Sequence, residues 1–184
     1  MVASLLFAML VPSAVSAEEV VVPVSLQAEL LTKVAEYDKN LAARAGDKVH
    51  VLILTRHGDA DSSRAAAQMQ TSLGSIASIA GLPHDEVIAP YSSGAQLAAM
   101  IRERHIAILY VAPGLGPEIE AIRFALDGVD VLSASAIADY VPRGIVLGFD
   151  LVSGKPKLLV QLTQARRQNV ALKADVLKIM KVYE

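Results

Sequence analysis

Two long apolar runs constrain the fold of this chain more than any other feature. Residues 49–54 and 106–112 are almost wholly Val, Ile, Leu and Ala, interrupted only by His50 and Tyr110. Runs without polar alternation are typical of strands that are covered on both faces. Such strands belong to parallel sheets with helices packed on either side, so the two runs predict an α/β domain.

Helical spacing and short β-rich stretches alternate along the rest of the chain. We expect helices over residues 25–45, 59–80, 93–104, 117–126 and 135–140, and further strands over residues 87–89, 129–132, 145–151 and 157–161. The last two strands are joined by Ser153-Gly154-Lys155-Pro156, which is too short for a crossover and predicts an antiparallel hairpin. The expected fold is a three-layer α/β/α sandwich with a mostly parallel sheet and a C-terminal antiparallel hairpin.

Each end of the expected domain carries an apolar stripe at helical spacing. The first stripe consists of Leu26, Leu30, Val34, Tyr37 and Leu41, and the second of Leu172, Val176, Ile179 and Tyr183. They predict an N-terminal helix with this face inward and a closing helix that packs on the sheet. Either stripe can also be shared between two copies, so we expect a two-fold homodimer through one of these elements.

The first residues have the layout of a secretory signal peptide. An apolar run over residues 5–11 is broken at Pro12-Ser13 and followed by the small residues Val15-Ser16-Ala17, although no Lys or Arg precedes the run. We expect residues 1–17 to be a signal peptide and residues 18–184 to form a single exported domain. The alternative is a buried N-terminal strand or helix.

Composition excludes several classes of function. The formal net charge of −2 gives no overall basic signature for nucleic acid. Residues 155–184 nevertheless hold seven Lys and Arg and two acidic residues, which indicates either a solvated helix face or a docking surface for an acidic partner. The absence of cysteine excludes disulfides, thiolate catalysis and Cys-ligated metals.

The motif Arg56-His57-Gly58 after the first buried strand resembles the signature of histidine phosphatases. That chemistry also needs a second histidine at the end of another central strand, and the strand over residues 106–112 ends in Ala112-Pro113-Gly114 instead. No nucleophile elbow, dinucleotide fingerprint or histidine-rich metal spacing is present. We therefore expect a non-catalytic protein without metal or cofactor, with a phosphatase as the weakest alternative.

The residues that follow the strands form a candidate ligand site. In open α/β sheets, ligands bind in the crevice outside the carboxyl ends of the strands. The candidate ligand-binding residues there are Arg56, His57, Gly114, Leu115 and Gly116. Arg56 and His57 would face an anion beside the start of a helix, or they are solvated loop residues.

Three stretches together resemble the YfiR-like family of periplasmic proteins. They are residues 48–90 with Ala80-Gly81-Leu82-Pro83, residues 109–115, and residues 140–149 continued by Gly154-Lys155-Pro156 and Ala165-Arg166-Arg167. The resemblance implies a periplasmic, dimer-forming regulator whose fold is close to half of a periplasmic binding protein. The chain departs from the family at Gln161, where Asn is usual, and at Tyr37-Asp38, where an aromatic residue and Pro are usual.

The resemblance also implies docking on the periplasmic region of a membrane sensor, such as a diguanylate cyclase or a sensor kinase. The candidate partner-contact residues are Leu30, Val34, Tyr37, Arg143, Lys155, Arg166 and Arg167. The alternative is a small-molecule receptor akin to the solute-binding component of a transporter, in which dimerisation replaces a second lobe.

Overall fold

Two buried strands form the centre of the sheet in the computed structural model, which describes residues 19–184. Every residue of β3 is buried, and so is every residue of β1 except the half-buried His50. The strands are β1 (Val49–Thr55), β2 (His84–Pro90), β3 (Ile106–Val111), β4 (Leu132–Ser135), β5 (Leu147–Val152), β6 (Lys155–Gln161) and β7 (Lys181–Tyr183). The predicted signal peptide, residues 1–17, lies outside the described residues.

The sheet is mostly parallel, with strand order β2-β1-β3-β4-β5-β6-β7. Each neighbouring pair from β2 to β5 is parallel. The β5–β6 pair is antiparallel, which confirms the predicted hairpin, and β7 pairs parallel to β6. The carboxyl ends of β1 to β5 therefore meet at one edge of the sheet, and the end of β6 meets the beginning of β5.

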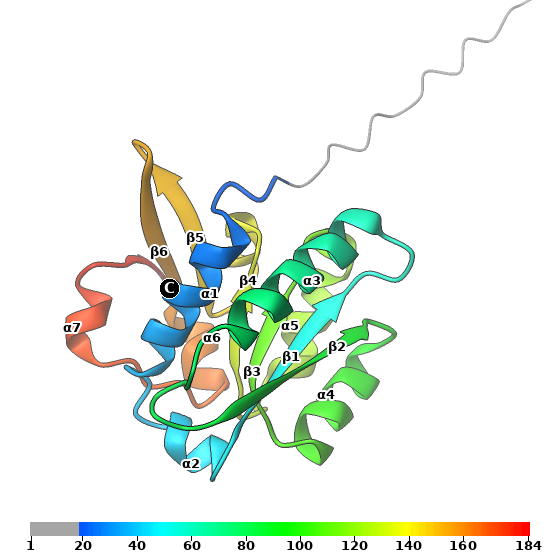
Figure 1. The fold of residues 1–184 in the computed structure, drawn as a ribbon, viewed down its shortest axis with the longest axis horizontal. Coiled ribbons are helices and arrows are strands. Elements are labelled where there is room, and N and C mark those ends of the chain that lie inside the picture. The colour runs from blue at the N-terminus through cyan, green and yellow to red at the C-terminus, as the bar shows by residue number, and fades with distance from the viewer. Residues whose placement is uncertain (1–18) are drawn as a thin grey trace, which may run out of the picture.

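Helices cover both faces of the sheet, so the predicted three-layer α/β/α sandwich is confirmed. They are α1 (Val24–Ala35), α2 (Leu41–Ala45), α3 (Ala60–Gly74), α4 (Gly94–Glu103), α5 (Ile119–Leu126), α6 (Leu162–Arg167) and α7 (Ala174–Leu177), with short 3-10 turns η1 (Gly116–Glu118) and η2 (Ala138–Tyr140). Helix α1 packs against α3, and both lie in front of the sheet in Figure 1, whereas α5 lies behind it and packs against α4.

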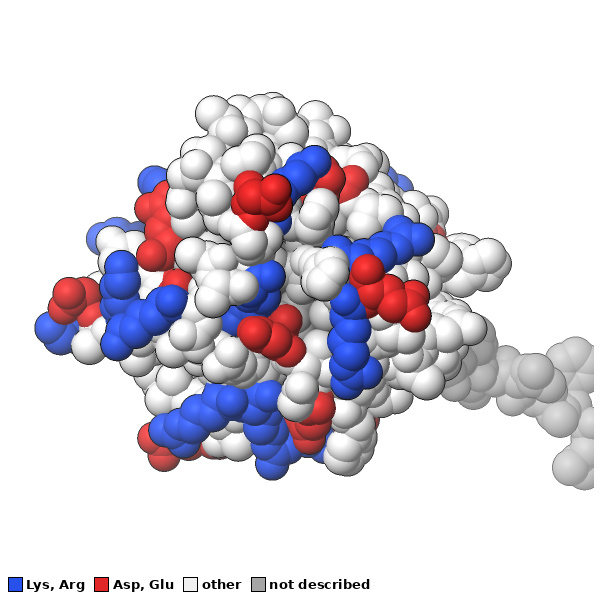
Figure 2. All heavy atoms as spheres, turned by 90° about the horizontal axis from the view of Figure 1, so that it is seen from below, with Lys and Arg blue, Asp and Glu red and all other residues white. Residues whose placement is uncertain are grey.

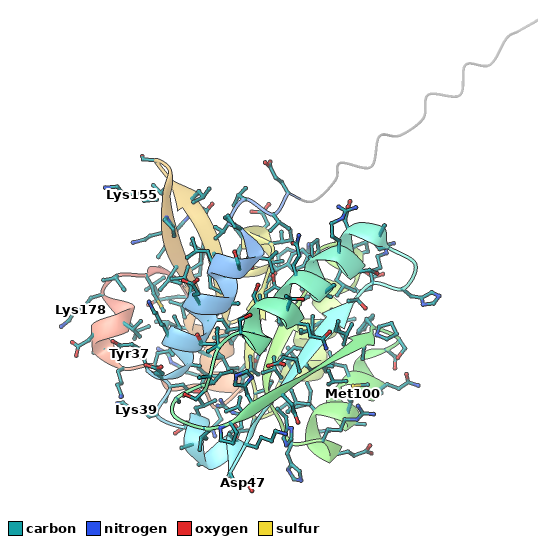
Figure 3. The ribbon with its side chains drawn as sticks, viewed as in Figure 1. Tyr37, Lys39, Asp47, Met100, Lys155 and Lys178 are labelled. Atoms are coloured by element: carbon teal, nitrogen blue, oxygen red, sulfur yellow. The ribbon has the colours of Figure 1, made fainter. Side chains whose placement is uncertain are left out.

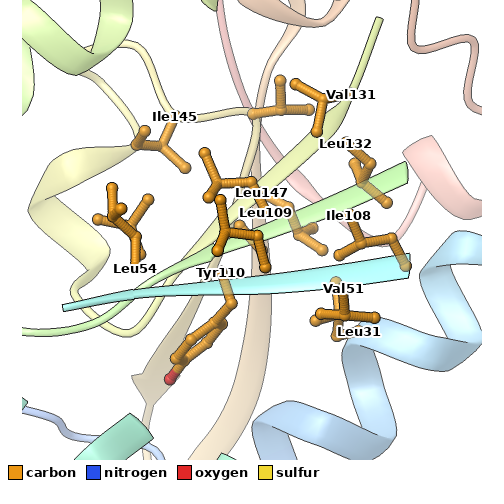
Figure 4. Packing of buried hydrophobic residues seen from close by; sticks show 14 of the residues in the cluster. Leu31, Val51, Leu54, Ile108, Leu109, Tyr110, Val131, Leu132, Ile145 and Leu147 are labelled. Atoms are coloured by element: carbon orange, nitrogen blue, oxygen red, sulfur yellow. The ribbon is translucent and has the colours of Figure 1, made fainter. Parts of the chain in front are cut away.

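The core between α1 and the sheet combines apolar packing with one buried polar pair. Leu31 of α1 lies beside Val51 and Ile108 (Figure 4). The Tyr110 hydroxyl donates to Gln27 Oε1 at 2.8 Å, and Gln27 Nε2 donates to the Val22 carbonyl at 2.9 Å. Burial raises the pKa of Tyr110, so the phenol stays protonated and keeps its donor.

The first helix is shorter than predicted, and its buried face is rotated. It ends at Ala35, and its buried residues are Val24, Gln27, Ala28, Leu31, Thr32, Val34 and Ala35. Leu26 and Leu30 are only half-buried, and Tyr37 is exposed. Small alanines on the inner face allow a close approach to the neighbouring elements, and Gln27 finds its partner in Tyr110, so packing overrides the simple apolar stripe.

The break after α1 is held by a buried ion pair. The Asp38 carboxylate accepts from Arg44 Nη1 at 2.8 Å, and its other oxygen accepts from the backbone N–H of Ala171 at 2.9 Å. Asp38 also forms an isolated antiparallel bridge with Leu172. A continuous helix from residue 25 to 45 would lose these contacts, which tie the N-terminal segment to residues 171 and 172.

Two further predictions require correction in the middle of the chain. Helix α3 ends at Gly74 rather than at residue 80, because residues 75–82 turn back so that Ile79 and Leu82 exchange backbone hydrogen bonds and Ile79 is fully buried. Strand β4 covers residues 132–135 instead of 129–132, and the helix expected over residues 135–140 is the three-residue turn η2.

The predicted closing helix is wrong. Residues 174–177 form a single helical turn, Ile179 is 61% exposed, and residues 181–183 form β7. The backbone groups at the free edge of β6 need partners, and pairing with β7 supplies them. The hairpin is therefore not the edge of the sheet, because β7 lies outside it.

The buried Tyr110–Gln27 pair predicts a non-additive double mutant. Tyr110→Phe and Gln27→Met should each lower the free energy of unfolding by about 1–3 kcal/mol, because each leaves a buried polar atom without a partner. The double variant should cost less than the sum of the two, with a coupling of about 1 kcal/mol. Urea unfolding of the four proteins measures this coupling, and strict additivity would contradict the account.

Candidate functional site

The predicted ligand residues meet at the carboxyl edge of the sheet, between the ends of β1 and β3. Arg56 Nη1 donates to the Gly114 carbonyl at 2.9 Å, and the Arg56 N–H donates to Ser62 Oγ at 2.9 Å. A Cβ on Gly114 would lie 2.9 Å from Asp59 Oδ2, so that carboxylate also reaches this turn. The strand order reverses between these two strands, and in open α/β sheets this is where ligands bind.

Several groups at this edge are already engaged within the protein. The Asp59 carboxylate caps α3 by accepting from the Ser62 N–H at 2.8 Å, which places a negative charge where an anion would sit. Leu115 is 1% exposed and belongs to the core, and the Gly116 carbonyl accepts from Arg143 Nη2 at 2.7 Å. His57 is exposed in the turn after β1. Ligand binding at this edge stays a prediction.

The structure brings no second histidine to His57. The chain has four histidines, and the other three are His50 and His84 at the beginnings of β1 and β2, and His105 just before β3. The beginnings of parallel strands lie at the opposite edge of the sheet from residue 57. The paired arrangement that a histidine phosphatase needs is therefore not formed by these residues.

A second candidate site is a cavity of about 300 Å³ beside α5, which we call the arginine cavity. It exists because the β5–β6 hairpin returns the chain to the beginning of β5, where α6 then lies next to α5. Its walls come from α5, from the turn before β5, and from the end of β6 with α6. The lining residues are Glu120, Arg123, Pro142, Arg143, Gly144, Gln161, Thr163, Gln164 and Arg167.

Positive charge exceeds negative charge in the arginine cavity, because three arginines and one glutamate line it. Glu120 contacts two of the arginines, with 3.1 Å from Oε2 to Arg123 Nε and 3.7 Å from Oε1 to Arg143 Nε. Arg167 pairs with Asp127 at 3.0 Å, just outside the lining. The side chains of the three arginines are 24–46% exposed, so their charges are screened only in part.

Two amide side chains that line the arginine cavity are held in place. Gln164 is 3% exposed, and its Nε2 donates to Asp127 Oδ1 at 3.2 Å. Gln161 Oε1 accepts from the Thr163 N–H at 3.0 Å, which caps the beginning of α6. The cavity therefore offers guanidinium, amide and hydroxyl groups to a polar ligand.

Gly144 gives Arg123 its position in the cavity wall. The glycine has φ +111°, and a Cβ built on it would lie 2.1 Å from Arg123 Cδ. The aliphatic part of Arg123 thus lies directly on the backbone at residue 144, and its guanidinium lies 4.0 Å from the centre of the Phe124 ring. Only glycine allows this close approach.

The predicted partner-contact residues fall into separate groups. Leu30, Val34 and Tyr37 line an apolar groove of about 240 Å³, whose other lining residues are Lys33, Leu158, Asp175, Val176 and Ile179. Arg143 and Arg167 line the arginine cavity instead. Figure 3 shows Tyr37 beside α7 and Lys155 far from it, toward the free end of the β5–β6 hairpin. Arg166 is exposed on α6.

Most of the arginine cavity was not predicted from the sequence. Arg143 and Arg167 were predicted only as partner contacts, and Glu120, Arg123 and Gln164 were not among the predicted site residues. Glu120 and Arg123 are three residues apart, which is the spacing of any exposed helix ion pair. One sequence feature could have pointed to the cavity, namely Arg143-Gly144 shortly before a strand. A glycine at that place leaves room for the side chain of a neighbouring element, here Arg123.

Charges of opposite sign are interspersed on the face shown in Figure 2, so that face presents no extended basic patch. No helix within residues 19–184 is both long and apolar enough to cross a membrane. Within the same residues, no group of three or more His, Asp or Glu side chains is placed to hold a metal ion.

Comparison with known proteins relates the fold to binding proteins. No family model and no curated protein matches the chain. A conserved domain protein from Vibrio cholerae matches with a TM-score of 0.59 and 18% identity, over 88% of this chain and 60% of that one. An ABC domain in complex with L-Trp from Streptococcus pneumoniae matches with a TM-score of 0.61 and 12% identity, over 88% and 60%.

A ligand-free, open substrate binding protein with adhesive properties from Clostridium difficile also matches. Its TM-score is 0.53 at 10% identity, over 79% of this chain and 58% of that one. The chain therefore spans about 60% of the length of these structures. At these identities the likeness concerns the fold, which resembles half of a periplasmic binding protein, as predicted.

The contact between Gly144 and Arg123 predicts a selective loss of stability. Gly144→Ala should lower the free energy of unfolding by about 1–3 kcal/mol more than Gly154→Ala does, because overpacking adds to the backbone strain. Gly154 is the matched control, since it has φ +73° but nothing within 4 Å of its would-be Cβ. Chemical denaturation measures both, and equal losses would show that Arg123 does not pack there.

Proposed function

We propose that the protein is a non-catalytic, exported binding protein that holds a small molecule in the arginine cavity. The observation that carries this proposal is the cavity itself, where three arginines, two buried glutamines and a threonine line one space of about 300 Å³ that is open to solvent. The likeness of the fold to binding proteins supports it, and the signal-peptide layout of residues 1–17 supports export.

The arginine cavity suits binding better than catalysis. Its arginines are permanently charged donors that orient a ligand but do not exchange protons near neutral pH. Its one acidic group, Glu120, is 53% exposed and already contacts two arginines. The lining thus provides recognition without a nucleophile paired to a base.

A thermal-shift screen of neutral, anionic and cationic metabolites tests the proposal. A compound at one hundred times its Kd stabilises the folded state by about 2.7 kcal/mol. For a domain of this size that corresponds to a rise in Tm of roughly 5–10 °C. The double variant Arg143→Gln and Arg167→Gln should lose the rise, because its cavity keeps only one arginine.

The matched control is Arg56→Gln at the carboxyl edge of the sheet, which should keep the rise in Tm. The opposite pattern, with the rise lost in Arg56→Gln and kept in the cavity variant, would move the site to the predicted edge. A screen in which no compound shifts the Tm would count against a small-molecule receptor of either kind.

A second candidate function is docking on the periplasmic region of a membrane sensor, which the apolar groove between α1 and α7 favours. Tyr37 and Ile179 line the groove and are 39% and 61% exposed, and Val182 of the adjacent β7 is 42% exposed. Lys33 and Asp175 lie at the same groove, so a partner needs an apolar surface flanked by charges of both signs.

Single-cysteine crosslinking tests the docking function, because the chain has no cysteine of its own. Ile179→Cys should crosslink to a cyclase or kinase sensor in native membranes, whereas the control Ser63→Cys on the exposed part of α3 should not. A product of twice the monomer mass would instead assign the groove to the predicted homodimer. Equal crosslinking of both variants would rule out a specific role of the groove.

A further inference from the structure

We propose that the arginine cavity takes a small dianion, and that Glu120 occupies the place of one of its two acidic groups until the ligand arrives. This inference rests on the proposed function, because it names the class of ligand for the same cavity. It also predicts that removal of Glu120 strengthens binding, whereas removal of an arginine weakens it. This difference tests the class of ligand separately from the proposed function.

The charges of the lining set the class of ligand. Three guanidinium groups line the cavity, and Asp127 pairs with one of them, Arg167, at 3.0 Å. Once Glu120 has turned away, the positive charges of Arg123 and Arg143 therefore have no counter-charge within the described lining. A ligand with two negative charges balances the lining, whereas a neutral or cationic ligand leaves it unbalanced or adds to the repulsion.

The donors that remain open also fit acidic groups. Arg123 contacts Glu120 through Nε, and within residues 19–184 neither of its Nη atoms has a hydrogen-bond partner. Arg143 uses Nη2 for the Gly116 carbonyl and contacts Glu120 only loosely, at 3.7 Å through Nε. Guanidinium groups donate to carboxylate and phosphate oxygens in pairs, so each arginine can donate to a further acceptor beside its present contact.

Glu120 is the built-in competitor for these donors. Its two carboxylate oxygens point to two different arginines, as the oxygens of a bound acid would. The side chain is 53% exposed, so it can turn outward into solvent when a ligand replaces it. Displacement of Glu120 costs part of the binding energy, and its removal should therefore strengthen binding.

The volume of the open cavity is sufficient for a small dianion. A water molecule takes up about 30 Å³ of liquid, so about ten water-sized groups fill a cavity of about 300 Å³. Compounds with two acidic groups on a short carbon chain have about this size. Succinate serves as the probe for a dicarboxylate. 2-Phosphoglycolate serves as the probe for a phosphate-type dianion at about pH 5, where its phosphate and its carboxylate each carry one negative charge. Acetate and succinamide serve as the single-charge and uncharged controls.

Isothermal titration calorimetry of the purified full-length protein tests the inference. Succinate or 2-phosphoglycolate should bind at least tenfold more tightly than acetate, and succinamide should not bind. Arg143→Gln and Arg167→Gln should each weaken binding at least tenfold, and Glu120→Gln should strengthen it about threefold or more. Arg64→Gln removes an exposed arginine on α3 that pairs with Asp61, and it should leave the Kd unchanged.

Three results would overturn the inference. The first is equal affinity for acetate and the dianions, and the second is weaker binding in Glu120→Gln. The third is a neutral or cationic compound that binds in the cavity, as shown by its loss in Arg143→Gln, while neither dianion binds. In that third case the cavity is still a binding site, and only the proposed class of ligand is wrong. If no compound binds at all, the proposed function is wrong as well.

Discussion

Burial of β1 and β3 on both faces is the constraint on which the rest of the structure depends. Almost every side chain of these strands is inaccessible to solvent, so helices must cover the sheet from both sides. Parallel neighbours then require crossover helices, which places α3 on one face and α4 and α5 on the other. The position of α5, and with it that of Glu120 and Arg123, follows from this requirement.

The antiparallel direction of β6 places α6 next to α5, which a purely parallel sheet would not do. Because β6 runs antiparallel to β5, its last residue, Gln161, lies near the beginning of β5 and leads α6 back to α5. The α6 residue Arg167 can then pair with Asp127 just after α5. The arginine cavity is therefore assembled from segments that a purely parallel order of strands would keep apart.

Much of the fold could be predicted from the sequence, because strong local patterns agree with the final packing there. The buried runs became β1 and β3, and the short connection at Ser153-Gly154 became a hairpin. The prediction was wrong where a distant contact decides the conformation. The first helix is interrupted at Asp38, which forms an ion pair with Arg44. Residues 181–183 have a helical sequence pattern but form a strand that pairs with β6.

The candidate site was less predictable, because its parts carry no local signature. Arg123 and Glu120 resemble any exposed helix pair, and Gln164 and Arg167 meet Asp127 only through contacts about forty residues apart in the chain. A ligand site was predicted at the carboxyl edge of the sheet because Arg56 and His57 follow a strand. Its turn is instead closed from within by Asp59 and by the bond from Arg56 to Gly114.

The most direct test of the central claim is a crystal structure of the protein grown with succinate or 2-phosphoglycolate. The account predicts that the dianion lies between Arg143 and Arg167, with an acidic group where the Glu120 carboxylate now lies and with Glu120 turned toward solvent. A dianion bound beside Arg56 and Gly114, or one bound in the cavity while Glu120 keeps its contacts with Arg123 and Arg143, would contradict it.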